Sequence, residues 1–393
     1  MKINILKSIA ILTILSAIFI PFLDLFGVFH ISLFFLCILF ILLTIHKRLR
    51  MIHYIVLLII IVWPIGGSIV AKLVYNLPLE INALRSFAPL FILFLAYFCF
   101  NVVDFSFKEI YKLIMLILTF VSLMIIIQLV YPGSSLLSIY IPDNRVDVLR
   151  RYAMIMAPIG NPNNMALFIS LLVLSCYQLL RSQSVNVSSK LYIYLHNVIL
   201  IFGIIFSYAR TVLVGFILSG LFLLLQNSKG PKQIIKITAS LVIILLTLNM
   251  IIDGSDINIR QITYYKTILN PFEDYSFTSR FDFWLTSFNI LINNPLLLIT
   301  GLGWFRGALM QLQGHTTIDS SYVYILLSHG FIFTSIFFAS IIHFMRQHPN
   351  ILPIFIVLLV SAINLAYVTD YRLNIIIAFF ISLNIKLQPG RSC

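Results

Sequence analysis

The sequence predicts an all-α, polytopic membrane protein with about twelve membrane-spanning helices. Apolar residues make up 61% of the chain and charged residues 10%, and the mean hydropathy is +1.04. Stretches without Asp, Glu, Lys or Arg recur along the whole length, each close to the roughly 20 residues that cross a bilayer as a helix. A soluble chain of 393 residues would instead form two or three domains of mixed composition. Lipid is therefore the expected solvent of most of this chain.

The apolar stretches place the expected spans in order. They lie at 6–23, 25–45, 54–71, 87–103, 113–131, 165–180, 191–209, 211–226, 234–252, 322–342, 351–368 and 373–385. The first is expected to be retained, because no small-residue cleavage site follows Pro21. The last is short, about 20 Å of helix, and ends at Lys386. No repeat or linker divides the chain, so residues 1–393 are expected to form one membrane domain.

Charge decides the expected orientation. With the N-terminus inside, the inner connections carry 15 Lys and Arg residues against Asp104 and Glu109, which accounts for the whole net charge of +13. The outer connections carry 11 basic and 11 acidic residues. This asymmetry follows the positive-inside rule and predicts a multi-pass inner-membrane protein with a cytoplasmic N-terminus. Nucleic acid is not an expected partner, because topology already explains the excess charge.

The basic residues also differ in kind between the two sides. The inner connections hold 10 Lys and 5 Arg, and the outer ones hold 2 Lys and 9 Arg. Topology needs only charge, whereas the planar guanidinium group binds phosphate or carboxylate through two bonds. For any single outer arginine, an ion pair with a nearby acidic residue is the simpler interpretation. The group of nine favours an anionic ligand on the outer face, with these candidate contacts: Arg85, Arg150, Arg210, Arg280 and Arg306.

Three outer connections are long enough to carry function, at 72–86, 132–164 and 253–321. In the longest we expect a helix that is capped by Thr278 or Ser279 and ended by Asn293, Asn294 and Pro295. Its apolar residues follow the i, i+3, i+4, i+7 spacing of one helix face: Phe281, Trp284, Leu285, Phe288, Leu291 and Ile292. Such a helix would lie along the bilayer surface with Arg280 in its first turn. A loop helix packed on the membrane domain is compatible with the same pattern.

Motifs of soluble enzymes are absent from the sequence, among them the nucleophile elbow, the P-loop and the zinc-protease motif. The four cysteines, at positions 37, 99, 176 and 393, share no outer loop, so a disulfide framework is not expected. The sequence has no His and Cys spacing typical of zinc and no Asp-x-Asp pair for a metal on a diphosphate. A mechanism without metal or cofactor is favoured. His30 and His329 lie within or beside spans, and we interpret them as hydrogen-bonded groups between helices rather than proton relays.

The outer face offers a candidate base. His315 precedes Asp319 by four residues, so a helix would place both on one face. A neutral imidazole accepts a hydroxyl proton near pH 7, and an adjacent carboxylate raises its basicity. Glu273 and Asp274 are an alternative, although a solvated loop is the simpler interpretation of that pair.

Two further segments could meet an anion. Arg210 closes the sequence Ser-Tyr-Ala-Arg between two apolar runs with no room for a loop, which places it at the rim of the bilayer. The segment 160–164, Gly-Asn-Pro-Asn-Asn, opens the sixth span with amide donors at the dipole-positive end of a helix. A turn with a helix cap explains the same residue types equally well.

In their order these features resemble the O-antigen polymerase and ligase superfamily. The segments that carry the resemblance are Asn161 to Asn164, Ser207 to Arg210, Ser279 to Trp284, Asn294-Pro295, Gly301 to Gly303, His315, Asp319 to Tyr322, and Gly330. The resemblance implies a GT-C-like membrane fold and an inverting, metal-independent glycosyltransferase that acts on the periplasmic face. It also implies that the donor and acceptor are oligosaccharides carried on undecaprenyl pyrophosphate. By the same resemblance Arg210 and Arg280 contact the pyrophosphate, and His315 activates the acceptor hydroxyl.

Within that superfamily the sequence favours a Wzy-type polymerase, which moves a growing glycan onto the nonreducing end of a new repeat unit. Ligases tend to show His followed closely by His-Asn, whereas this chain reads His-Thr-Thr-Ile-Asp from His315 to Asp319. The same departure leaves either residue as the base. A chain-length regulator protein would be a further partner of a polymerase. An O-antigen ligase, which transfers glycan to lipid A-core, is the alternative in the same class, and a lipid-glycan flippase or other transporter is the alternative from another class. Transport is disfavoured because charged residues are nearly absent from the spans and two related halves are not visible.

Overall fold

The computed structural model describes residues 2–21, 24–25, 29–78, 84–132, 134–141, 154–181, 186–227, 275–303 and 320–387. Over these ranges the chain is helical, apart from two antiparallel two-residue strands, β1 (Asp24–Leu25) and β2 (Phe29–His30). Five of the described helices are long and apolar enough to cross a membrane: α3 (Met51–Tyr75), α5 (Phe107–Val130), α8 (Pro162–Arg181), α9 (Val187–Phe206) and α16 (Ser321–Gln347).

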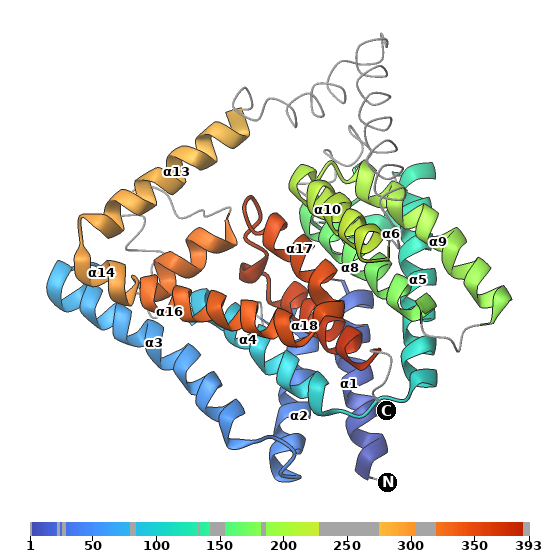
Figure 1. Cartoon of the computed structure of the whole chain (residues 1–393), viewed down its shortest axis with the longest axis horizontal. Coiled ribbons are helices and arrows are strands. Elements are labelled where there is room, and N and C mark those ends of the chain that lie inside the picture. Colours follow the sequence, from blue (N-terminus) through green and yellow to red (C-terminus); the bar gives the residue numbers. More distant parts are fainter. Residues whose placement is uncertain are drawn as a thin grey trace.

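The other described helices are shorter or less apolar (Figure 1). They are α1 (Lys2–Phe19), α2 (Ile31–Ile45), α4 (Leu84–Val102), α6 (Ser135–Ser138), α10 (Arg210–Asn227), α13 (Tyr275–Ile292), α14 (Pro295–Thr300), α17 (Leu352–Ser361) and α18 (Tyr371–Lys386), with the 3-10 turns η3 (Pro349–Ile351) and η4 (Tyr367–Thr369). Helix thus occupies each expected span except 234–252, which lies outside the described residues. The helical membrane-protein class is supported, and the number of crossings stays a prediction.

The second predicted span began too early. Residues 24–25 and 29–30 pair as antiparallel strands, with Asp24 opposite His30, and α2 begins at Ile31 rather than Leu25. His30 caps this helix, because its Nδ1 lies 3.2 Å from the N–H of Ser32 while its Nε2 lies 3.2 Å from the carbonyl oxygen of Ile20. The interpretation of His30 as a hydrogen-bonded group is therefore confirmed.

The helices run back and forth between two ends of the bundle. We name one the Arg210 end; it gathers residues 17–21, 154–164, 206–210 and 362–374. We name the other the Lys7 end; it gathers residues 4–7, 100–112, 181, 186–190, 346–351 and 384–387. At the Arg210 end, the N–H of Ile155 donates to the carbonyl oxygen of Phe206 at 3.1 Å. At the Lys7 end, the ammonium of Lys7 contacts a carboxylate oxygen of Glu109 at 3.0 Å.

Basic residues concentrate at the Lys7 end. The turn between α2 and α3 belongs to this end, because the ring of His53 stacks on that of Phe98 near the close of α4, 4.5 Å between centroids. The described basic residues there are Lys7, Lys47, Arg48, Arg50, Lys108, Lys112, Arg181, Lys190, Arg346 and Lys386. These are residues of the predicted inner connections. The side of the membrane that this end faces is a prediction from the positive-inside rule.

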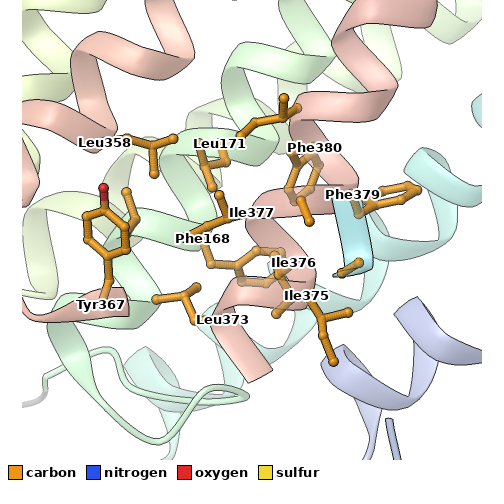
Figure 2. Close-up of a cluster of buried hydrophobic side chains, with 14 of the residues drawn as sticks. Phe168, Leu171, Leu358, Tyr367, Leu373, Ile375, Ile376, Ile377, Phe379 and Phe380 are labelled. Atoms are coloured by element: carbon orange, nitrogen blue, oxygen red, sulfur yellow. The ribbon is translucent and has the colours of Figure 1, made fainter. Parts of the chain in front are cut away.

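Helix α18 is the centre of the bundle. Every residue from Arg372 to Ile385 is buried, and the helix packs against α1, α4 and α8. Figure 2 shows Phe168 and Leu171 of α8 beside Ile376, Ile377 and Phe380 of α18. At its far end the ammonium of Lys386 donates to the carbonyl oxygens of Phe100, at 2.8 Å, and Val103. The last predicted span is therefore a helix that reaches from one end of the bundle to the other.

Candidate functional site

Arg210 begins α10 directly after a tight turn. Ser207 closes α9, Tyr208 adopts a left-handed φ of 57°, and Arg210 is half-buried. The bond from Ile155 to Phe206 places the turn beside residues 154–160. The predicted hairpin without a loop is therefore present.

The Asn-Pro-Asn-Asn segment forms a helix cap. Asn161 Oδ1 accepts hydrogen bonds from the backbone N–H groups of Asn163, at 3.0 Å, and Asn164, at 3.4 Å. The Asn164 side chain donates to a carboxylate oxygen of Asp370 at 2.8 Å. The turn-and-cap interpretation is confirmed, and the segment is also joined to the start of α18.

Asp370 and Arg372 hold this end of the bundle together. Asp370 caps α18 by accepting the N–H groups of Arg372, at 3.0 Å, and Leu373, at 3.1 Å. Arg372 is 0% exposed, and its guanidinium donates to the carbonyl oxygens of Ala17, Ile18 and Pro158. Arg372 is one of the nine outer arginines, but it is not among the five candidate contacts, since no local pattern reveals which arginine a bundle will bury.

The start of α16 docks on the same region. Ser320 Oγ donates to the carbonyl oxygen of Ala362 at 3.1 Å, and Ser321 Oγ to that of Leu365 at 2.7 Å. The Tyr322 hydroxyl donates to the Leu359 carbonyl oxygen at 2.6 Å. Two motif segments that are distant in sequence, 161–164 and 320–322, thus meet residues 359–370 at the Arg210 end. The third, 207–210, lies at the same end, where the preceding residue Phe206 bonds Ile155.

Comparison with known proteins adds no assignment to this geometry. No protein-family model matches the chain, and no curated protein or solved structure is significantly similar to it. The resemblance drawn from the motifs therefore stays a prediction, and any function has to be argued from the residues themselves.

The glycine motifs form a second meeting point. Residues 301–303 lie against α16, where the N–H groups of Leu302 and Gly303 donate to the carbonyl oxygens of Leu327, at 2.6 Å, and Ser328, at 3.0 Å. Gly330 interrupts α16 with φ 74°. A Cβ atom on Gly301 would lie 2.5 Å from the backbone nitrogen of Gly330, so only glycine permits this approach. Gly301, Gly303 and Gly330 are thus brought together.

Arg280 lies on a different element from Arg210. It is half-buried on α13, which packs on α14 and α16, and Figure 1 shows α13 apart from α10. Thr278 and Ser279 do not cap this helix, because it begins one turn earlier, at Tyr275; that prediction was wrong. The predicted end before Asn293-Asn294-Pro295 is confirmed, since α13 stops at Ile292 and α14 starts at Pro295.

The apolar residues of α13 divide between two faces. Leu291 is fully buried at 0% exposure, whereas these four form a stripe with spacings of 4, 3 and 4 residues, 40% to 62% exposed: Phe281, Leu285, Phe288 and Ile292. The sequence pattern alone suggested a single face. Trp284 is half-buried like Arg280, so one side of the helix packs on the protein and the adjacent side is exposed.

The remaining predicted site residues are not placed. His315, Asp319, Arg150 and Arg306 lie outside the described residues, as do Glu273 and Asp274. Arg85 lies in the first turn of α4, with only its backbone described. Within the described ranges, His, Cys, Asp and Glu form no group of three or more that could hold a metal ion.

Proposed function

We propose that this protein is an O-antigen polymerase, a glycosyltransferase that moves a growing glycan from undecaprenyl pyrophosphate onto a lipid-linked repeat unit. The observation that carries the proposal is the convergence of the segments 161–164, 207–210 and 320–322 at the Arg210 end. These segments are far apart in the sequence, and no local pattern requires them to lie at the same end. A shared site is the simplest reason for unrelated segments with polar residues to meet at one end of an apolar bundle.

Arg210 is the proposed pyrophosphate contact. It combines a guanidinium group with the N-terminal, dipole-positive end of α10, and both features stabilise an anion. Its half-buried position at the end of the bundle suits a phosphate group attached to a membrane-embedded chain. Electrostatic stabilisation of the leaving pyrophosphate is the main requirement of an inverting transfer, together with one base.

The outer loop 253–321 is proposed to supply the rest of the site. It carries His315 and Asp319, either of which would serve as the base, and it carries Arg280 and Arg306 as further phosphate contacts. Arg85 and Arg150 would approach from the connections before α4 and α8. The mechanism needs no metal or cofactor, and a chain-length regulator protein is the expected partner.

Helix α13 is proposed to lie along the periplasmic surface of the inner membrane, within a GT-C-like fold of about twelve spans. Its exposed stripe, formed by Phe281, Leu285, Phe288 and Ile292, continues through Leu296 and Ile299 of α14, which are 46% and 43% exposed. Apolar side chains in this arrangement favour the boundary of the acyl chains over water. The loop would then keep its charged residues at the depth of the lipid pyrophosphate.

The first prediction tests Arg210 in a strain whose surface polysaccharide depends on this protein. Arg210→Ala should leave lipid A-core bearing one repeat unit and no ladder on a gel, because the leaving group loses its counter-charge. Arg210→Lys should restore only part of the ladder, since an ammonium group cannot bind phosphate through two bonds. Arg346→Ala, at the opposite end of the bundle, is the matched control and should keep the full ladder.

Each other result has a distinct meaning. Loss of every repeat unit in Arg210→Ala would point to ligation or flipping rather than polymerisation. A normal ladder in Arg210→Ala, Arg280→Ala and His315→Ala alike would reject the proposed site, provided that immunoblots show equal amounts of protein in the membrane.

A further inference from the structure

Helix α16 is interrupted where it meets two other elements. Gly330 has φ 74° and ψ 179°, so regular helical bonding stops there and a second half, residues 331–347, begins. Trp63 Nε1 of α3 donates to the carbonyl oxygen of His329 at 2.6 Å. The backbone N–H groups of residues 302 and 303 donate to the carbonyl oxygens of residues 327 and 328. These bonds satisfy the end of the first half. The second half begins after this interruption, and the carbonyls that precede it already accept bonds from residues 302, 303 and 63, so its start is a dipole-positive helix end.

His329, just before this interruption, has one bonded ring nitrogen. Its side chain is 0% exposed, and Nδ1 lies 2.6 Å from Ser328 Oγ. Ser328 Oγ also lies 2.7 Å from the carbonyl oxygen of Tyr324, and only the hydroxyl can supply the hydrogen of that bond. Nδ1 therefore carries the imidazole hydrogen and donates it to Ser328. Nε2 is left as a lone-pair acceptor, and it has no partner within the described residues.

The side chain of His329 lies beside the start of residues 331–347. The ring of His329 contacts that of Phe333, in the first turn of residues 331–347, with 4.3 Å between centroids. A buried acceptor without a donor is costly and rare in native interiors. The positive end of the helix dipole disfavours a cation at this place, and the lone pair of the neutral imidazole disfavours an anion. A group that donates one hydrogen bond to Nε2 and accepts one from the helix N–H groups suits both features.

We infer that His329 Nε2 and the start of residues 331–347 bind a single O–H group. The donor is either a buried water molecule or the hydroxyl of a lipid. This site is separate from the proposed transfer chemistry at the Arg210 end, so it does not depend on the proposed function. It also revises the sequence interpretation of His329 as a group satisfied by neighbouring helices.

The test is 15N NMR of the full chain labelled at its 8 histidines, in micelles of lauryldimethylamine oxide, a detergent without hydroxyl groups. The resonances missing from His329→Phe identify His329, and Ser328→Ala provides a second identification because it shifts Nδ1. His30 is an internal reference, since its Nε2 faces a carbonyl oxygen and carries the hydrogen. We expect the opposite tautomer at His329, with Nε2 shifted upfield from a free acceptor nitrogen.

The same experiment distinguishes a buried water molecule from a lipid hydroxyl as the source of the O–H group. An upfield Nε2 resonance in the micelles alone assigns the donor as water. A resonance that moves upfield only after addition of farnesol, a long-chain alcohol, assigns it as a lipid hydroxyl. An Nε2 resonance at the free-acceptor position under both conditions, or a hydrogen on Nε2, would overturn the inference.

Discussion

At the scale of single residues, Arg372 joins three segments that are far apart in the sequence. Its guanidinium reaches the end of α1 and the carbonyl of Pro158, while its backbone belongs to the first turn of α18. A buried charge is tolerated only when it is paired or hydrogen-bonded, and here Nε and Nη2 donate to backbone carbonyl oxygens. The residue is therefore structural, although sequence analysis grouped it with arginines expected to bind an anion.

Removal of this side chain should be costly. We predict that Arg372→Met lowers the free energy of unfolding by about 3 to 5 kcal/mol, because buried carbonyl oxygens lose their donors and Asp370 loses a neighbouring positive charge. Denaturant unfolding in micelles, followed by circular dichroism, measures the change. Arg346→Met, at an exposed position, is the control and should change it by no more than about 0.5 kcal/mol. Equal effects of the two substitutions would contradict the structural role of Arg372.

At the scale of elements, the start of α5 is fixed by a capping box and an ion pair. Ser106 Oγ caps the N–H of Glu109, and the Glu109 carboxylate accepts from the N–H of Ser106 at 2.7 Å and from Lys7 of α1. Partial burial alone would raise the pKa of Glu109, but the bonds from Ser106 and Lys7 outweigh it and leave the pKa below its ordinary value of 4.5. The sequence Ser-x-x-Glu indicates this helix start. The ion pair with Lys7 of α1 is a tertiary contact that the local sequence does not indicate.

This lowered pKa predicts a direction for the pH dependence. A carboxylate whose pKa falls on folding stabilises the protein above its unfolded pKa, and the contribution disappears as the pH drops through the folded value. Stability should therefore decline below about pH 4.5 by at most about 1 kcal/mol from this residue, because the pair is partly exposed. Unfolding measured between pH 3 and 7 should show this component in the parent protein and not in Glu109→Gln. An unchanged pH profile in Glu109→Gln would show that the pair contributes nothing.

The contact between α3 and residues 300–303 offers a matched pair of glycines. A Cβ atom on Gly67 would lie 2.8 Å from the carbonyl oxygens of Thr300 and Gly301, whereas one on Gly66 would meet nothing within 4 Å. Gly67→Ala should thus separate α3 from this turn and destabilise the protein by about 1 to 3 kcal/mol. Gly66→Ala should be neutral or stabilising by up to about 1 kcal/mol, because alanine favours a helix. Thermal unfolding of both variants measures the difference, and similar midpoints would argue against the close contact.

At the scale of the whole molecule, the separation of charge predicts how the bundle sits in the membrane. Tyr131, 66% exposed, begins the connection at the Arg210 end, and Gln347 is exposed at the Lys7 end. In a chain freed of its own cysteines, Tyr131→Cys should react with a membrane-impermeant maleimide in cells with a permeabilised outer membrane, and Gln347→Cys should not. After lysis both should react. The reverse pattern in intact cells would invert the predicted orientation.

The parts of this molecule that the sequence predicts are those set by local pattern. Apolar runs located the helices, and the Ser-Tyr-Ala-Arg turn before α10 followed from the absence of room for a loop. Contacts between distant segments were not predictable, because Arg372 and Asn164 find their partners only once the bundle has assembled. The pattern of α13 likewise gave its amphipathic character and its end, but not the division of its apolar residues between protein and exposed stripe.

The central position of α18 has a consequence for the order of assembly in the cell. The ribosome delivers α1, α4 and α8 to the membrane long before it synthesises residues 371–386, yet these earlier helices enclose α18 on its sides. We therefore expect the bundle to stay open, with lipid or a membrane chaperone in its middle, until the late helix arrives. A pause in translation upstream of residue 371 would prolong that open state and expose it to membrane proteases.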